Sequence, residues 1–459
     1  MNPGAKGFCP PSSTPCRHVL LAAGRPIGRP IYGLVRVAAV PVAFALVLAS
    51  CASTRVPPLT QAGTQYGMEE DEQKLIRRSD ELERELAEKG LVYDDPALLE
   101  YLDAVGQKLV PPAARGRIRF RFAVLRDPTI NAFALAQGSV YVHTGLLARL
   151  ENEAQLAMIL GHEVAHTVER HQLEFLRSLR NKTVAAKVAE MVLLPAAVVF
   201  GGAGGGQLAS DLLALSYAAT VTGFGRENEE EADRQGLLAM ARAGYDVREG
   251  VRVFELLTEM EDPGALEGFF YSSHPSNEAR REYLRGLLRS GLVRAEAGRT
   301  NAEAYRRATE GVVVENIRLR LRRRHYDYAR REAERALARD PTRATLHYYL
   351  GEAHRLLATD PEGAAKEAAL RKRTTRVDRK IVESFRSKAP EEFEAALEAY
   401  RRALSLDPSL ALAHRGIGMV AHARGERETA SKALRAYLAG RPDAPDRRYV
   451  EKILRELGS

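Results

Sequence analysis

The chain has few cysteines. Only three occur among 459 residues, at positions 9, 16 and 51. The first two fall in a segment that we expect to be removed from the mature protein, so Cys51 is the one cysteine that remains. A disulfide within the mature chain is therefore excluded, even if the protein works in an oxidising compartment.

Long uninterrupted hydrophobic runs are also missing. The apolar run 37–48 has only about twelve residues, which is too short to cross a bilayer comfortably. The stretch 188–225 is longer, but Pro195, Glu190, Asp211 and a run of glycines interrupt it. We expect this stretch to form a loop or helical hairpin that would touch the bilayer or control access to a neighbouring cleft.

The first fifty residues have the layout of a bacterial secretory leader. Arginines precede the apolar run, which ends in Leu48-Ala49-Ser50-Cys51. This ending matches a bacterial lipoprotein box, in which the cysteine after a small residue receives a lipid. We therefore expect a signal peptide over 1–50, lipidation of Cys51 and a tether over 51–66. The alternative is an ordinary transmembrane anchor.

Much of the positive charge belongs to this leader. The formal net charge of the whole chain is +8, and residues 1–50 carry five basic side chains and no acidic one. Removal of the leader lowers the net charge to +3, so we expect no nucleic-acid partner. No aspartate follows Cys51, and by resemblance to other bacterial lipoproteins this indicates the periplasmic face of the outer membrane of a Gram-negative bacterium.

A histidine motif, H-E-x-x-H, lies within the segment 153–176, whose apolar residues recur at helical spacing. Residues four apart on a helix lie on one face, so His162 and His166 are placed to bind the same metal ion. Glu163 flanks that face and can act as a general base towards a metal-bound water. His171 lies outside this face by its spacing, and we expect a structural role for it.

A third metal ligand is offered by a second helical run that begins at Arg226. Glu229 and Asp233 are again four residues apart on one face. Glu229 can complete a site of two histidines and one glutamate, and Asp233 can hydrogen-bond the free nitrogen of a ligand histidine. The alternative is a charged helix N-terminus, where acidic residues are favoured by the helix dipole.

Four motifs together resemble the HtpX and CaaX-prenyl-protease family of zinc metallopeptidases, over roughly residues 67–290. They are the histidine motif, the R-x-x-E-x-E-A-D run from Arg226, the N-A-F-A run within 131–142, and His274-Pro275 followed by Arg280. Within that family the chain is similar to the soluble periplasmic, BepA-like branch with tetratricopeptide repeats. The resemblance implies one Zn²⁺ per chain on His162, His166 and Glu229, with Glu163 as the catalytic residue.

Two further features bear on how substrate would reach the metal. The segment 117–125 alternates as a strand with one buried face, and 131–142 predicts a strand pair near the metal helix. In zincin-like peptidases an edge strand receives the substrate backbone, which makes Asn131, Ala132, Phe133 and Ala134 candidate substrate-binding residues; the alternative is a core hairpin. We expect His274 to act as a transition-state stabiliser or an inhibitory switch, or to form a structural hydrogen bond.

The last third of the chain contains a repeat. The run R-A-L-x-x-D-P occurs at 335–341 and again at 402–408, and Pro442 lies 34 residues beyond Pro408. A period near 34 residues with a closing Asp-Pro is typical of tetratricopeptide repeats, which stack into a concave surface for peptides or partner proteins. The charged segment 361–389 is expected to be an insertion. The alternative is a purely structural helical cap.

These patterns predict an α+β, mostly helical protein with a zincin-like peptidase domain and small β-sheet over 67–290, and an α-solenoid of tetratricopeptide repeats over 291–459. The resemblance implies a zinc endopeptidase that hydrolyses misfolded or misassembled envelope proteins at the outer membrane. Its partners would be these proteins, the outer-membrane assembly machinery through the repeats, and the membrane through the lipid. The main alternative is a chaperone-like assembly factor that acts mainly through its repeats.

Overall fold

The computed structural model describes residues 56–61, 67–181, 224–258, 277–293, 297–372, 374 and 376–458, which all belong to one compact unit of the chain. Three of the sequence predictions lie outside these residues: the leader with Cys51, nearly all of the stretch 188–225, and His274. Among the helices in the described ranges, none is both long enough and apolar enough to span a membrane.

A three-stranded mixed sheet supports the helix that carries the histidine motif. Its strands are β1 (Arg121–Leu125), β2 (Ala132–Ala134) and β3 (Ser139–His143). The spatial order is β1-β3-β2, with β1 parallel to β3 and β2 antiparallel to it. The small sheet and the strand pair predicted within 131–142 are therefore confirmed, and β2 lies at an edge.

The alternating segment 117–125 forms a shorter strand than its pattern predicts. β1 begins only at Arg121, which pairs with Ser139, the first residue of β3. Within the strand the alternation has its expected effect: Phe122 and Val124 are buried, whereas Arg121 is exposed.

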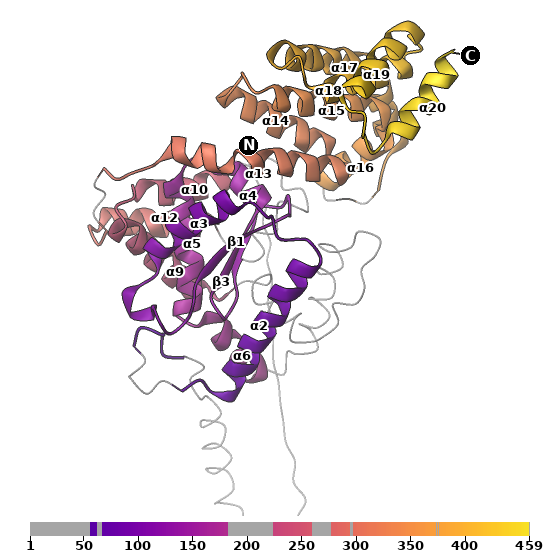
Figure 1. Cartoon of the computed structure of the whole chain (residues 1–459). Coiled ribbons are helices and arrows are strands. Elements are labelled where there is room, and N and C mark those ends of the chain that lie inside the picture. Colours follow the sequence, from indigo (N-terminus) through magenta and orange to yellow (C-terminus); the bar gives the residue numbers. More distant parts are fainter. Residues whose placement is uncertain are drawn as a thin grey trace, which may run out of the picture. The chain divides into compact units, whose positions relative to one another are not determined.

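Helices cover both faces of the sheet (Figure 1). They are α2 (Glu70–Glu88), α3 (Pro96–Leu109) and α5 (Glu153–Val168). Leucines of α2 pack on the face that carries Phe133 and Tyr141, whose rings stack at 5.3 Å between centroids. The opposite face, with Val140 and Val142, joins α3 and α5 in the main hydrophobic core. Successive strand residues point to opposite faces, so each layer of helices takes alternate side chains.

The histidine-bearing helix α5 is buried at every one of its positions. Asn152 precedes its first residue and caps the helix, because the Asn152 side chain accepts a hydrogen bond from the N–H of Gln155 at 2.9 Å. The single helix predicted over 153–176 is wrong in one respect. α5 ends at Val168, and a second helix, α6 (His171–Asn181), follows after Arg170 adopts a left-handed backbone with φ of 61°.

Further helices complete the packing around α5. They are α4 (Thr144–Arg149), α9 (Arg226–Arg242), α10 (Arg248–Thr258) and α12 (Asn277–Arg289). α9 and α10 pack against α5, and α12 packs against both α9 and α10. Three helices distant in sequence, α5, α9 and α12, are thus brought close to one another.

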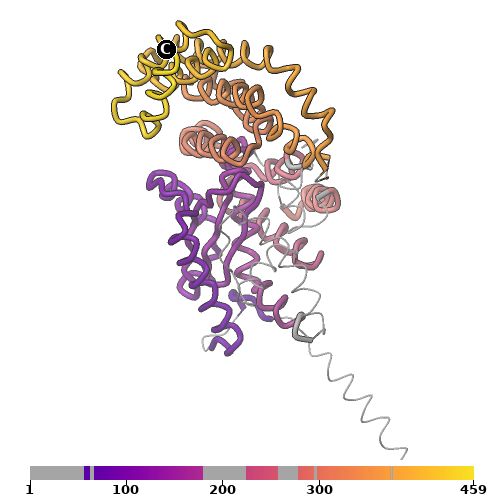
Figure 2. The backbone as a smooth tube through the Cα atoms, turned by 90° about the vertical axis from the view of Figure 1, so that its right-hand side faces the viewer, coloured from indigo at the N-terminus to yellow at the C-terminus, as the bar shows by residue number. Residues whose placement is uncertain are grey.

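The C-terminal part is helical throughout its described residues, as expected. Its helices pack against one another in series (Figure 2): α13 (Ala302–Arg322), α14 (Tyr326–Arg339), α15 (Ala344–Thr359), α16 (Pro361–Arg371), α17 (Arg379–Leu406), α18 (Ala411–Ala423), α19 (Arg427–Gly440) and α20 (Arg447–Gly458). The repeat family and the domain boundaries stay predictions. The segment 361–389, expected to be an insertion, contains α16 and the first part of α17. Helix α15, which precedes this segment, packs against α17.

The Asp-Pro pairs end helices, as the repeat pattern predicts locally. α14 ends one residue before Asp340-Pro341, and α17 ends one residue before Asp407-Pro408. The ring of a proline disfavours helical backbone at the preceding residue, which stops the helix there. The Asp407 carboxylate then accepts a hydrogen bond from the N–H of Ser409 at 2.9 Å, which fixes the turn into the next helix.

Polar side chains join α13 to the end of the sheet. The Tyr305 hydroxyl donates to the carbonyl oxygen of Leu147 at 2.6 Å, and Thr144 Oγ1 donates to Asn316 Oδ1 at 2.9 Å. These groups are buried, so each hydrogen bond fixes the position of α13 against α4.

Candidate metal centre

The two motif histidines meet on one face of α5, as their spacing predicts. Their Nε2 atoms lie 2.9 Å apart, and both side chains are almost fully buried. The rings are nearly perpendicular, with centroids 4.6 Å apart. Both Nε2 lone pairs can therefore reach a single point in space.

Glu229 of α9 completes a set of three possible ligands. Its carboxylate oxygens lie 3.5 Å from His162 Nε2 and 3.6 Å from His166 Nε2. Within the described part of the chain, these three residues are the group whose ligand atoms all lie within 4.8 Å of one another. The helix-dipole interpretation of the acidic run does not explain why one of its carboxylates is buried beside two histidines.

Two glycines allow α9 to come this close to α5. A Cβ atom added at Gly161 would lie 3.2 Å from the Cα of Gly236, and one added at Gly236 would lie 3.0 Å from the backbone nitrogen of His162. Larger residues would push the helices apart. The backbone contact thus sets the distance at which Glu229 faces the histidines.

Asp233 lies directly behind the first histidine. Its Oδ1 is 3.0 Å from His162 Nδ1, the nitrogen that does not face the other ligands. Burial alone would raise the pKa of Asp233, but the Arg280 guanidinium and the hydrogen bonds from Arg280 and His162 outweigh burial and lower it to about 2. The ionised carboxylate can therefore hold the proton of His162 on Nδ1, which leaves Nε2 available for a metal.

Arg280 of α12 holds the two carboxylates of α9. Its Nε and Nη2 donate to the two oxygens of Asp233 at 2.8 and 2.6 Å, and its Nη1 lies 3.1 Å from Glu229 Oε2. Burial by itself would lower the pKa of Arg280, yet Asp233, Glu229 and Glu163 outweigh it and raise that pKa. The sequence showed Arg280 only as part of a motif; its contact with Asp233 spans 47 residues.

Glu163 is buried next to these groups, at 2% exposure. Because it immediately follows His162 on α5, its carboxylate flanks the face from which the ligand histidines project. It is one of the charges that act on Arg280, which places it within the same electrostatic cluster.

The donor set fits a zinc ion. Two imidazole nitrogens and one carboxylate are three protein ligands of the kind that hold catalytic zinc, and they leave a fourth position for water. Each histidine also has a partner at its second nitrogen, as metal-bound histidines generally do.

Sequence reasoning missed the partner of the second histidine. His171 Nδ1 lies 2.9 Å from His166 Nδ1, and the His171 side chain is almost completely buried. The spacing argument placed His171 off the metal face and assigned it a structural role. It belongs to α6, and the left-handed turn at Arg170 brings it back onto His166.

The strand expected at residues 131–134 is present as β2, and side chains form hydrogen bonds with the backbone groups on its outer edge; its role in substrate binding stays a prediction. In β2, Phe133 pairs with Tyr141 of β3, so the backbone groups of Ala132 and Ala134 point away from β3. The N–H of Ala132 donates to Asn131 Oδ1 at 2.9 Å, and Gln172 Nε2 donates to the carbonyl oxygen of Ala134. Residues 131–134 are all buried.

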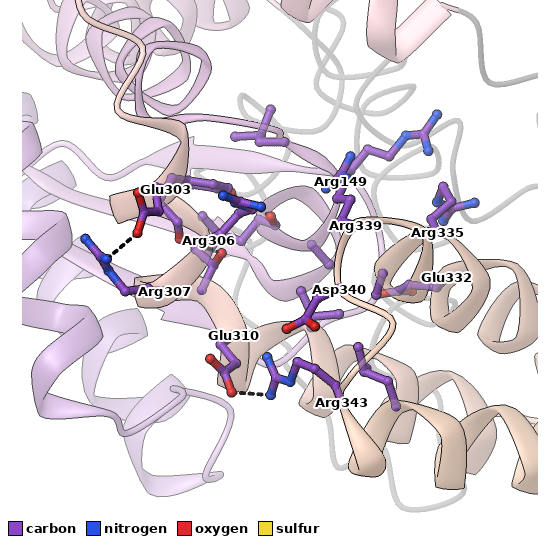
Figure 3. A pocket seen from close by; sticks show the side chains of 18 residues that line it. Arg149, Glu303, Arg306, Arg307, Glu310, Glu332, Arg335, Arg339, Asp340 and Arg343 are labelled. Atoms are coloured by element: carbon purple, nitrogen blue, oxygen red, sulfur yellow. Dashed lines mark hydrogen bonds and ion pairs between the residues drawn. The ribbon is translucent and has the colours of Figure 1, made fainter. Parts of the chain in front are cut away.

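A cavity of about 290 Å³ lies away from the histidines, between α4, α13 and α14 (Figure 3). Its walls carry arginines, two of which pair with acids in the same walls. Arg307 contacts Glu303 at 2.6 Å, and Arg343 contacts Glu310. None of the proposed metal or catalytic residues lines this cavity.

Comparisons with known proteins agree with this geometry. Residues 96–288 match peptidase family M48. A beta-barrel assembly-enhancing protease of Escherichia coli strain K12 is 27% identical over 222 residues, which are 48% of this chain and 45% of that protein. A Vibrio cholerae protein that bears the same name provisionally is 33% identical over 215 residues, 46% of this chain and 43% of its own.

A mitochondrial protein is also similar to this chain. The metalloendopeptidase OMA1 of Arabidopsis thaliana is 32% identical over 193 residues, 41% of this chain and 36% of that protein. The chain thus spans less than half the length of each of these curated relatives. The region 96–288, which holds both histidines, Glu229 and Arg280, therefore resembles peptidase family M48, and the chain is similar over about half its length to the beta-barrel assembly-enhancing proteases.

Proposed function

We propose that this chain is a zinc-dependent endopeptidase whose ligands are His162, His166 and Glu229 and whose general base is Glu163. The observation that carries the proposal is the meeting of the three ligand groups, from helices α5 and α9, in a buried cluster. The M48 match and the names of the relatives support the same reaction class.

Each side chain of the proposed site has a separate role in peptide hydrolysis. His162, His166 and Glu229 would hold the zinc ion, which would supply Lewis acidity for the scissile carbonyl and for the attacking water. The Glu163 carboxylate takes a proton from the attacking water and passes it to the leaving amine. Asp233 keeps the His162 proton on Nδ1, and Arg280 keeps Asp233 ionised and fixed in place.

Substrate would bind as an added strand along the outer edge of β2, through residues 131–134. The Ala132 N–H and the Ala134 carbonyl are the backbone groups that such a strand would use. In the structure they bond to the side-chain amides of Asn131 and Gln172. These amides occupy the positions of a substrate carbonyl and a substrate N–H, and an incoming strand would replace them.

The sequence and the names of the relatives support a proposal for the cellular location. We place the mature chain in the periplasm, tethered through lipidated Cys51 to the outer membrane of a Gram-negative bacterium. Its substrates would be misfolded or misassembled envelope proteins, and its C-terminal helices, as tetratricopeptide repeats, would contact these proteins or the assembly machinery. The phrase "beta-barrel assembly-enhancing" in the names of two relatives supports this role. His274 stays a candidate switch: if it blocks the metal, His274→Ala should raise proteolysis.

The decisive test of the catalytic assignment is Glu163→Gln in the full mature chain. We expect this variant to bind one zinc per chain as the wild type does and to digest an unfolded model protein, reduced and alkylated α-lactalbumin, at least about 100-fold more slowly. Glu227→Gln, an exposed neighbour of Glu229, serves as the matched control with unchanged activity. Digestion by Glu163→Gln at the wild-type rate would refute the assignment.

The same variant separates the alternative function. The helical C-terminal part and the assembly role in the relatives' names favour a second candidate, a chaperone-like assembly factor. If Glu163→Gln digests nothing and still supports outer-membrane protein assembly in cells, binding is the main function. If the variant loses both digestion and outer-membrane protein assembly, proteolysis is the main function.

A further inference from the structure

The two ligand histidines have different partners at their second nitrogen. His162 Nδ1 faces the Asp233 carboxylate at 3.0 Å, whereas His166 Nδ1 faces another imidazole, that of His171, at 2.9 Å. His166 Nε2 is the atom that faces His162 and Glu229, so Nδ1 is the one left for the protein to hold. The carboxylate partner follows a common pattern for metal sites, but the imidazole partner needs its own explanation.

The geometry fixes the protons along this chain of groups. When His166 binds metal through Nε2, its single remaining proton is on Nδ1, and only an acceptor can face it. His171 must then offer the lone pair of its Nδ1 and carry its own proton on Nε2. That atom lies 3.7 Å from Glu231 Oε2 of α9, the helix that also supplies Glu229. A neutral imidazole thus stands between a metal ligand and a carboxylate.

The structure around His171 holds the ring in this orientation. The preceding Arg170 has φ of 61°, a left-handed conformation that residues with a side chain rarely adopt. Its guanidinium is fixed by a two-pronged contact with Glu72 of α2 and donates to the carbonyl oxygen of Pro57 at 3.1 Å. The turn at Arg170 is thus held by contacts with both Glu72 and Pro57. This turn places His171 against His166.

An aromatic ring closes the other side. Phe224, just before α9, stacks on His166 with centroids 4.1 Å apart and planes 24° apart, and its centroid lies 5.8 Å from that of His171. Phe224 is buried, so water is kept from this part of the ring pair. In such surroundings a ligand N–H without an acceptor would lose a hydrogen bond that water could not replace.

We propose that His171 is a positioning residue for the metal: its Nδ1 accepts the Nδ1 proton of His166 and so fixes the tautomer and ring orientation in which His166 Nε2 binds zinc. This inference rests on the proposed zinc site and adds a residue to it. Loss of a partner of this kind typically weakens metal binding by about 10- to 100-fold.

A matched pair of substitutions distinguishes this role from simple packing. His171→Asn keeps an acceptor oxygen near the place of Nδ1, whereas His171→Leu has nearly the shape of asparagine and no acceptor. We expect the zinc dissociation constant, measured by competition with a chromophoric chelator on the full mature chain, to rise about 10- to 100-fold for His171→Leu and to stay within about threefold of wild type for His171→Asn. Equal binding by the two variants would overturn the proposal.

Two further readouts guard against a folding artefact. The visible spectrum of the cobalt-substituted protein reports ligand geometry, and we expect it to change for His171→Leu and to be retained by His171→Asn. Glu231→Ala, at the partly exposed end of the chain of groups, should weaken zinc binding slightly, by about two- to fivefold, whereas Glu230→Ala, its neighbour paired with Arg226, should not. If Glu231→Ala leaves binding unchanged and His171→Leu does not fold without metal, the residue is structural and the proposal fails.

The outcomes also separate this inference from the proposed function. If the wild type itself fails to bind zinc in stoichiometric amount, the zinc site is wrong. If the wild type binds zinc and both His171 variants bind it equally well, only the positioning role is wrong.

Discussion

Gly161 of α5 and Gly236 of α9 lie backbone against backbone, where the two helices that carry the proposed metal ligands pack together. A side-chain carbon on Gly236 would lie 3.0 Å from the nitrogen and 3.4 Å from the Cα of His162. Gly236, which limits the separation of α5 and α9, is therefore in contact with the backbone of His162. Any increase in the separation moves Glu229 and Asp233 away from the histidines together, because both are on α9.

This contact predicts the effect of enlarging Gly236. We expect Gly236→Val to lower the free energy of unfolding by about 1–3 kcal/mol through overpacking and to weaken zinc binding. Gly286→Ala on α12, where an added Cβ meets nothing within 4 Å, is the control and should be neutral or stabilising by up to about 1 kcal/mol. Denaturant unfolding and zinc titration measure the two effects. Wild-type zinc affinity in Gly236→Val would show that the crossing does not set the site.

Arg280 gives a prediction about charge balance in the absence of metal. Arg280→Met leaves two buried carboxylates, Asp233 and Glu229, without their cation, and breaking a buried charge cluster in this way costs about 3–5 kcal/mol. Bound zinc restores a positive charge next to Glu229, so the loss of stability should be smaller with zinc than without it. Thermal unfolding with and without zinc measures this difference, with Arg281→Ala as the control. A loss that is the same in both conditions would contradict the assigned contacts.

The edge of β2 predicts a kinetic effect of Gln172. In Gln172→Ala the Ala134 carbonyl loses its side-chain donor, so a substrate strand no longer has to displace it. One hydrogen bond of about 1 kcal/mol corresponds to a fall in KM of about fivefold, with kcat unchanged. Gln137→Ala in the adjoining turn is the control. Peptide kinetics test the idea, and an unchanged KM would remove β2 as the substrate strand.

Two buried histidines predict acid sensitivity of the junction between the sheet and α13. Burial lowers the pKa of His143 to about 4 against the opposing effect of Asp127, and burial with Arg320 and Arg323 nearby lowers the pKa of His325 to about 4. The unfolded chain takes up these protons first, near pH 6.5, so stability is full above that pH and falls as the pH drops from about 6.5 to 4. Each group accounts for up to about 3 kcal/mol.

The measurement is the melting temperature of the metal-free chain between pH 7 and pH 4.5. His325→Leu removes one of these two histidines and should make the fall in melting temperature smaller. Burial raises the pKa of Glu367 to about 7, and this buried carboxyl opposes the histidines because its protonation favours the folded state as the pH drops. A fall in His325→Leu as large as that of the wild type would contradict the prediction.

The parts of the site that lie within single helices could be predicted from the sequence. His162 and His166, and likewise Glu229 and Asp233, are four residues apart, and helical geometry alone puts each pair on one face. The structure adds contacts that depend on how the helices pack. His171 meets His166 only because Arg170 takes a left-handed turn, and no residue pattern of α5 signals that turn.

Contacts between residues far apart in the chain could not be predicted from the sequence either, because they also depend on how the elements pack. Arg280 and Asp233 are far apart along the chain, and Gln172 of helix α6 reaches Ala134 of strand β2. The motif containing Arg280 marked the residue but not its partner. The fold class was predictable because periodicity is local, whereas the early end of the helix predicted over 153–176 depends on a single backbone angle.

The complete burial of α5 has a consequence for when activity can begin. Because each of its residues contacts the core or a neighbouring helix, the histidines cannot take up their positions before the sheet, α3 and α9 have assembled around them. Folding is therefore a precondition of metal binding, and bound metal in turn stabilises the folded core by mass action. A newly made copy that has not finished folding has no complete site, so the proposed proteolysis can begin only after the chain itself has folded.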